Sequence, residues 1–455
     1  MARSAVRDLT VGSPMKLVLG FATPLLFGFI FQQLYNIVDT AIVGQFLGAN
    51  ALAAVGSTGS INFLILGFCM GICSGFSIPI AQSFGAREES EMRRYVVNSA
   101  YLSGIFGVIL AILTGFLCPQ MLQWMNTPAD IIDDAVAYIQ IIFFGIPATM
   151  LYNMTGGILR ALGDSKTPVY FLVVASIVNI VLDLTLILVV PMGVAGAAIA
   201  TVVSQIVSGV GCLIVMKKRF PILHCTADER RFRSLHAKKL TNIGIPMGLQ
   251  YSITAIGSVV VQVAVNGLGT VAVAAVSAAG RLNNFFCCIF DALATTMATF
   301  AGQNIGARKV RRINEGLKAS SILGIIYCVL AFVIIYFFGE PMIGLFVSAS
   351  DANAASVTDL AQEYMVISAA FYIPLLFVNI VRLSIQGMGY TQIAVCAGIC
   401  EMIARTLVGW LLVPIFGYTA ACYASPVAWL AADAFLFPCY FSIIKKLKKR
   451  LGDHE

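Results

Sequence analysis

Apolar residues run along this chain in long blocks that short polar segments separate. A membrane-spanning α-helix needs about 20 mainly apolar residues, and twelve blocks reach that length. The composition agrees, because 59% of the 455 residues are apolar and only 11% are charged, against about 25% charged in soluble domains. We therefore predict an all-α integral membrane protein with spans at 17–46, 52–83, 93–118, 130–159, 168–190, 194–216, 240–266, 272–302, 316–338, 358–387, 391–414 and 418–444.

Positive charge lies almost entirely on one side of these spans. All but three of the 29 lysines and arginines fall at the two chain ends and in alternate loops, and the other loops contain none. Cytoplasmic loops of membrane proteins carry the excess of Lys and Arg, so we expect an even number of spans with both termini in the cytoplasm. The three exceptions, Arg281, Arg382 and Arg405, lie within or near predicted spans.

The two halves of the chain resemble each other. A polar stretch at 217–239 separates six spans from six, and AQSFGAR at 81–87 recurs as GQNIGAR at 302–308. Six helices per copy leave both copies in the same orientation, so we expect a pseudo-two-fold axis along the membrane normal. The predicted domains are an N-lobe at 1–216, a cytoplasmic linker at 217–239 and a C-lobe at 240–455.

Five oxygen-bearing side chains of the first half share a predicted depth. They come from the first, fourth, fifth and sixth spans and are Asp39, Tyr138, Asn179, Asp183 and Thr201. Counting inward about eight residues from the outer ends puts most of them about 12 Å below the outer surface. Intramembrane acids are costly and usually face a protein interior or a wet cavity, where they bind ions or substrates. This set is our candidate site.

The chemistry of the candidate site allows two ions. Carboxylate, amide and hydroxyl oxygens are ligands that a hard cation such as Na⁺ prefers, and a pair of neighbouring carboxyl groups can instead hold a proton. A structural alternative also stays open, in which Asp39 reaches the headgroup region while Thr201 and Tyr138 only hydrogen bond between helices or at the interface. The repeat aligns Asp39 with Val260, so the acidic set belongs to the first half alone.

Other polar residues indicate structure more than chemistry. Glu401 and Arg405 are four positions apart on the eleventh span, which favours a helix ion pair, whereas the partner of Arg281 is left open. The twelve cysteines fall almost all in apolar spans and the three histidines in polar segments, so we expect neither disulfides nor a histidine metal site. There is no phosphate-binding loop of the GxxxxGK[ST] type and no catalytic constellation, so we expect a non-enzyme without cofactors.

Four motifs on this duplicated plan resemble one transporter family. VDTAIVG at 38–44, AQSFGAR at 81–87, LRALGDSKTP at 159–168 and GQNIGAR at 302–308 are similar to the multidrug and toxic compound extrusion family, in particular to its branch related to the DNA-damage-inducible protein F. The resemblance implies two six-helix lobes facing a central cavity and export of cationic or amphipathic compounds in exchange for H⁺ or Na⁺.

The resemblance also implies roles for individual residues. Asp39, Asn179 and Asp183 would form the coupling site, with Thr201 and Tyr138 as neighbours. Helix one would bend at its proline, Pro24, since proline removes a helix hydrogen bond. The acids that the norfloxacin-exporter branch carries on helices seven and ten are missing here, which argues against a coupling site on those two helices.

We therefore expect a secondary multidrug antiporter in the bacterial cytoplasmic membrane, monomeric, with organic cations or drugs and the lipid bilayer as partners and no nucleic acid. If Na⁺ is the coupling ion, its ligands would be Asp39, Asn179, Asp183 and Thr201. The alternative is a flippase of the same superfamily for lipid or lipid-linked oligosaccharide. The few intramembrane arginines favour the exporter.

Overall fold

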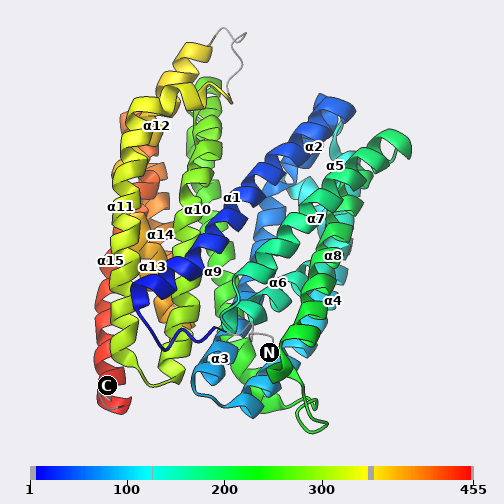
Figure 1. Ribbon diagram of the computed structural model, residues 1–455. Helices are drawn as coiled ribbons and strands as arrows, with labels where there is room; N and C mark the ends of the chain where they lie inside the picture. The colour runs from blue at the N-terminus through cyan, green and yellow to red at the C-terminus, as the bar shows by residue number, and fades with distance from the viewer. Residues whose placement is uncertain (1–6, 126, 347–352, 452–455) are drawn as a thin grey trace. The chain divides into compact units, whose positions relative to one another are not determined.

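The computed structural model describes residues 7–125, 127–346 and 353–451; the predicted cytoplasmic chain ends at 1–6 and 452–455 lie outside them. The described ranges form helices and no strands (Figure 1). The first half contains α1 (Pro14–Leu47), α2 (Ala49–Ser57), α3 (Gly59–Gly85), α4 (Glu89–Trp124), α5 (Ile132–Phe144), α6 (Ile146–Ala161), α7 (Lys166–Leu184), η1 (Thr185–Val189), α8 (Val194–Arg219) and η2 (Pro221–Leu223). The second contains α9 (Ser234–Asn266), α10 (Thr270–Gly306), α11 (Val310–Ile343), α12 (Ala354–Ala370), α13 (Tyr372–Gly387), α14 (Thr391–Leu407), η3 (Val408–Leu412) and α15 (Val413–Leu451).

The described helices account for the twelve predicted spans. Nine segments are each long and apolar enough to cross a membrane, and the pairs α5–α6 and α12–α13, bent by 46° and 53°, pass the same test together. One segment, Thr391–Leu451, has 61 residues, about 90 Å of helix, and is kinked at Gly417, whose φ is 63°. It therefore holds two crossings, and the predicted all-α membrane fold is confirmed.

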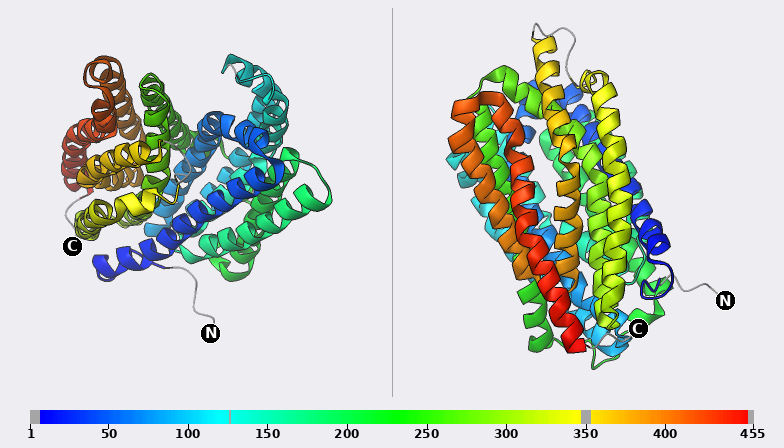
Figure 2. Two further views of the ribbon diagram at one scale, coloured as in Figure 1. Left: turned by 90° about the horizontal axis from the view of Figure 1, so that it is seen from above. Right: turned by 90° about the vertical axis from the view of Figure 1, so that its left-hand side faces the viewer.

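The chain packs as two compact units. Unit 1 is Met1–Val11 with Thr23–Ser252, and unit 2 is Gly12–Ala22 with Ile253–Glu455. The ends of the units fall inside two continuous helices, α1 and α9, so each of these helices contributes to both units. The sequence-based domain ranges follow the repeats, whereas the compact units follow packing. Figure 2 shows the long helices of the chain from two further directions.

The repeat is visible in the backbone conformation at equivalent helix ends. Arg87 and Arg308, which close the two GAR motifs, both have φ 60°, a left-handed conformation that is uncommon for a residue with a Cβ. Gly163 and Gly389 follow α6 and α13 with φ of 88° and 94°. Each copy also contains a π-helical turn at the equivalent place: η1 follows α7, and η3 follows α14. The two halves therefore share local geometry as well as helix order.

Glycines bring α9 against α3 within unit 1. A Cβ built on Gly71 would lie 2.6 Å from the Cα of Gly248, and one on Gly75 would lie 2.6 Å from the Cα of Gly244. Such backbone contact is typical of membrane helices with small residues four positions apart. Any side chain at these positions would force the helices apart, so the first half of α9 is bound closely to the first repeat.

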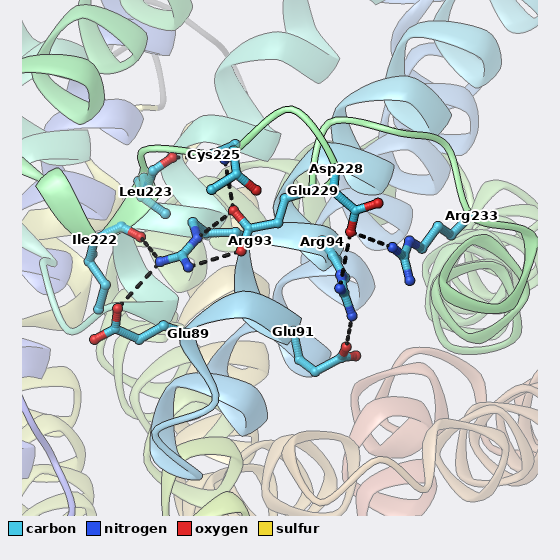
Figure 3. Close-up of polar contacts among 11 residues, drawn as sticks. Glu89, Glu91, Arg93, Arg94, Ile222, Leu223, Cys225, Asp228, Glu229 and Arg233 are labelled. Carbon is cyan, nitrogen blue, oxygen red and sulfur yellow. Dashed lines mark hydrogen bonds and ion pairs between the residues drawn. The ribbon is translucent and has the colours of Figure 1, made fainter.

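An ion-pair clasp binds the segment between α8 and α9 to α4 in unit 1 (Figure 3). Arg93 donates from Nε and Nη2 to both carboxylate oxygens of Glu229 at 2.9 Å, and its Nη1 reaches Glu89 and the carbonyl of Ile222 at 3.3 Å. Glu229 also accepts from the backbone N–H of Thr226 at 2.9 Å. These donors, with Arg93 first, lower the pKa of Glu229 to about 2.

A second group of charges extends the clasp. Arg94 pairs with Glu91 at 2.6 Å and with Asp228 at 3.3 Å, and Asp228 also pairs with Arg233 at 2.7 Å (Figure 3). The buried His236 in the first turn of α9 lies 2.8 Å from Glu91. The predicted linker is therefore a structured segment of unit 1.

Candidate ion-binding site

The structure brings the five predicted site residues together inside unit 1. Asp39 lies on α1, Tyr138 on α5, Asn179 and Asp183 on the last two turns of α7, and Thr201 on α8. Asn179 and Asp183 are fully buried and Tyr138 is buried, whereas Asp39 and Thr201 are half-buried. Tyr138 interacts electrostatically with both aspartates. Four helices thus contribute to one small polar cluster in an apolar unit.

The centre of the cluster is a pair of carboxyl groups. Asp39 and Asp183 lie within hydrogen-bond reach of each other, and a bond between two carboxyl groups requires one proton. Apart from that bond, Oδ1 of Asp39 and Oδ1 of Asp183 are buried without a partner among the described residues. Buried oxygens without donors are costly, so this pair is suited to take up a proton or a cation.

Asn179 connects the carboxyl pair to the neighbouring helices. In the amide orientation that satisfies both of its polar atoms, Nδ2 donates to Asp183 Oδ2 at 2.8 Å and to the hydroxyl of Tyr35 at 3.1 Å, while Oδ1 accepts from the backbone N–H of Thr201 at 3.1 Å. Asn179 and Asp183 are four positions apart, which puts both side chains on one face of α7. The Asn179 amide therefore links α7 to both α1 and α8 at the site.

Tyr35 is a site residue that the sequence analysis missed. It lies four positions before Asp39, on the same face of α1, and interacts with Thr201, Asp39 and Asp183. The i, i+4 spacing within the first span was the signal that could have identified it. Its hydroxyl adds another oxygen to the cluster.

The cluster lies beside a local irregularity of the helix. The π-helical turn η1 begins at Thr185, two residues after Asp183, and the Thr185 hydroxyl donates to the carbonyl of Val181 at 2.7 Å. Single π-helical turns occur often at functional sites because they free backbone groups and re-aim side chains. Pro24, the predicted bend, lies inside α1 two residues after the end of the unit 2 segment; its role stays a prediction.

The oxygens of the cluster suit a small hard cation as well as a proton. Among the described residues there is no group of three or more His, Cys, Asp or Glu side chains that could hold a metal ion. The ligands for Na⁺ would instead be mixed, with the two unpartnered Oδ1 atoms joined by the Thr201 hydroxyl, which donates to the carbonyl of Ala197 at 3.1 Å and keeps a lone pair. Asn179 would orient this set.

The second repeat has an arginine where the first has the amide of the candidate site. The spacing that relates Gly163 to Gly389 also relates Asn179 to Arg405. Arg405 pairs with Glu401 at 3.3 Å, the ion pair that the sequence predicted. Arg382 of α13 also pairs with Glu401. The third intramembrane arginine of the sequence analysis, Arg281, is exposed on α10.

Comparisons with known proteins agree with this architecture. The family described as MatE matches residues 24–185 and 246–411, one segment in each repeat. The chain is 30% identical over 338 residues to the probable multidrug resistance protein YoeA of Bacillus subtilis, which covers 73% of each protein. It is 27% identical over 356 residues to the DNA damage-inducible protein F of Escherichia coli, covering 76% of this chain and 74% of that protein.

The fold is also that of solved transporters. A structure described as an outward-facing conformation of a multidrug resistance MATE family transporter of the MOP superfamily matches with a TM-score of 0.91 at 22% identity, covering 99% of this chain and all of that one. The predicted family and its twelve-helix, two-lobe fold are thereby confirmed. The chain belongs to the multidrug and toxic compound extrusion family, whose members are multi-pass membrane transporters and not enzymes.

Proposed function

We propose that this protein exports cationic or amphipathic organic compounds in exchange for H⁺ or Na⁺, with Asp39 and Asp183 as the groups that bind the coupling ion. The observation that carries the proposal is the contact between two intramembrane carboxyl groups on different helices. Two acids in contact repel when both are ionised, so an ion or proton between them stabilises the approach of α1 to α7. Release of the ion favours their separation.

The coupling then follows from charge. With the pair empty, the repulsion of the two carboxylates favours a different position of α1, and loading neutralises them. A ligand can shift a conformational equilibrium only through its differential affinity for the two states. Here the difference would be the geometry of the Asp39–Asp183 pair, and Pro24 is where α1 would bend between the states, since the helix lacks a backbone hydrogen bond there.

A proton is the coupling ion that the geometry supports better. One proton satisfies a bond between two carboxyl groups, and Asn179 already donates to Asp183 Oδ2 while its own oxygen accepts from Thr201. Na⁺ needs several oxygens around it at once. It would therefore bind only if the carboxyl groups moved apart to admit it, with Thr201 as a further ligand.

The test is transport by the purified protein in liposomes. Uptake of a fluorescent organic cation is measured under a pH gradient, under a Na⁺ gradient and without any gradient. The wild type, Asp39→Asn and Asp134→Asn are compared under each condition. Asp134 is an exposed acid on α5 one turn before Tyr138, so it matches the change in charge outside the carboxyl pair.

We expect gradient-driven transport by the wild type and by Asp134→Asn, and none by Asp39→Asn at the same amount of folded protein. Full transport by Asp39→Asn would exclude the carboxyl pair from coupling. If neither gradient moves the dye in the wild type, the flippase alternative is tested next with a fluorescent lipid. Further parts of the proposal are a monomeric state, checked by the mass of the detergent-solubilised particle, and a cytoplasmic location of both termini, checked by labelling of engineered cysteines.

A further inference from the structure

Unit 2 contains a counterpart of the candidate site in which an arginine stands where unit 1 has an asparagine. The repeat that relates Arg87 to Arg308 places Asp39 on Val260, and the spacing from Gly163 to Gly389 places Asp183 on Gly409. The structure supports this alignment, because a Cβ built on Gly409 would lie 3.8 Å from Val260 Cγ1. The contact that two carboxyl groups make in unit 1 is thus an apolar contact between a valine and a glycine in unit 2.

Arg405 lies within this counterpart, one turn before Gly409. It stands at the position of Asn179, and its Nη1 lies 3.3 Å from where a Cβ of Gly257 on α9 would be. It also interacts with Tyr364, which occupies in α12 the place that Tyr138 has in α5. Arg405 is only 7% exposed, and its Nη1 is buried without a hydrogen-bond partner among the described residues. The guanidinium therefore reaches from α14 to α9, as the ion site of unit 1 joins α7 to α1.

The surrounding charges keep this guanidinium in place. Its Nη2 lies 3.3 Å from Glu401, which is 3% exposed. Arg382 pairs with the other oxygen of Glu401 and interacts with Asp433 of α15. An arginine remains protonated in proteins and presents its donors in a rigid plane. Unlike a bound ion, it cannot leave.

We propose that Arg405 is a built-in cation: its guanidinium permanently bridges α14 and α9 one turn from the position that corresponds to the coupling ion of unit 1, so that unit 2 stays in the ion-loaded arrangement throughout the cycle. The ligand class of this pocket is then a guanidinium group, supplied by the chain itself. The inference about the cycle rests on the proposed function, whereas occupancy of the pocket does not. One coupling site per protein follows from it.

The first experiment removes the side chain and returns its charged group. Arg405→Ala is purified, and its thermal unfolding is followed with millimolar guanidinium or with the same concentration of urea, which has nearly the same shape but no charge. We expect guanidinium to raise the unfolding temperature of Arg405→Ala by several degrees more than that of the wild type, and urea to have no such effect. Arg311→Ala is the matched control, because Arg311 is 71% exposed and pairs with Glu315 at 3.4 Å.

The second experiment keeps or removes the charge without leaving a cavity. Arg405→Lys is expected to retain gradient-driven transport and Arg405→Gln to lose most of it. Equal transport by the two variants, or stabilisation of Arg405→Ala by urea and guanidinium alike, would show that only the volume of the side chain matters and would overturn the proposal. If the alanine variant does not fold even with guanidinium, the Lys and Gln pair decides.

The outcomes separate this inference from the proposed function. A wild type without gradient-driven transport would contradict the antiporter and leave the unfolding experiment intact. Selective stabilisation by guanidinium would then still establish a cation-filled pocket in unit 2. Transport that is driven normally while guanidinium fails to stabilise Arg405→Ala would contradict the built-in cation alone.

Discussion

The two repeats have the same order of helices, but different side chains meet where equivalent helices come into contact. In unit 1, α1 and α7 meet through Asp39 and Asp183, both with a buried oxygen that lacks a donor. In unit 2, α9 and η3 meet through Val260 and Gly409, and Arg405 lies one turn away. A pair of acids can gain and lose a cation, whereas an arginine holds its charge permanently.

A duplicated scaffold can become functionally asymmetric through a few polar positions. Helix packing depends on the apolar faces and glycines that both copies share, and a few polar substitutions leave that packing in place. At one aligned position, unit 1 has Asn179 with an oriented amide, whereas unit 2 has Arg405 with a fixed charge. On the two proposals above, unit 1 would respond to an ion while the charge of unit 2 would stay constant.

The largest effect is expected from Asp183→Asn. The amide cannot take up a proton and leaves Asp39 without a second carboxyl group, so gradient-driven transport should fall to the level of empty liposomes. Asp433→Asn, the same change at a buried acid of unit 2, should retain ion-driven transport. The reverse result, with Asp433 required and Asp183 dispensable, would place ion coupling in unit 2 and break the comparison.

Glu401→Gln should have the next largest effect, on stability. The change leaves Arg382 and Arg405 without their shared carboxylate, and removing one partner of a buried ion pair costs about 3–5 kcal/mol. A fall in the thermal unfolding temperature would be measured in detergent. Glu315→Gln is the control, because that exposed pair with Arg311 contributes about 0–1 kcal/mol. Equal stability of the two variants would mean that the arginines of unit 2 do not depend on Glu401.

Tyr35→Phe should weaken ion binding at the unit 1 site without abolishing transport. It removes the hydroxyl to which Asn179 donates at 3.1 Å, and a hydrogen bond contributes about 1 kcal/mol, or roughly a fivefold change in affinity. The measurement is the ion concentration that gives half-maximal transport. Tyr101→Phe is the control, because it removes a solvent-exposed hydrogen bond to the carbonyl of Arg230 and should leave that concentration unchanged. An identical shift in both variants would contradict a specific role for Tyr35.

The smallest effect on transport is expected from the clasp between α4 and the linker. The pKa of Glu229 is lowered to about 2, so the stability that its ionised form provides is fully present above the ordinary value of about 4.3 and is lost only as pH falls through 2. Arg93→Gln should therefore lower the unfolding temperature but leave the pH profile of transport between pH 5 and 8 unchanged. A displaced profile would show that the clasp takes part in ion coupling.

Much of the fold was predictable because a bilayer allows few solutions. Helices must satisfy their own backbone hydrogen bonds in lipid, so apolar length alone predicted twelve spans. Their orientation, which we expect from the positive charge, stays a prediction. The spans at 130–159 and 358–387 were predicted as single elements, and each is a pair of helices bent at its middle. The alignment of the repeats also predicted that the acidic set of the candidate site belongs to one half.

The tertiary structure decided what those residues do to one another. Sequence spacing could place Asn179 and Asp183 on one face of α7, because that relation lies within a single helix. It could not show that Asp39 contacts Asp183, that Tyr35 completes the cluster, or that Arg382 shares Glu401 with Arg405, because those contacts join helices far apart in the chain. Periodicity determines which face a residue occupies, and only packing determines what lies opposite.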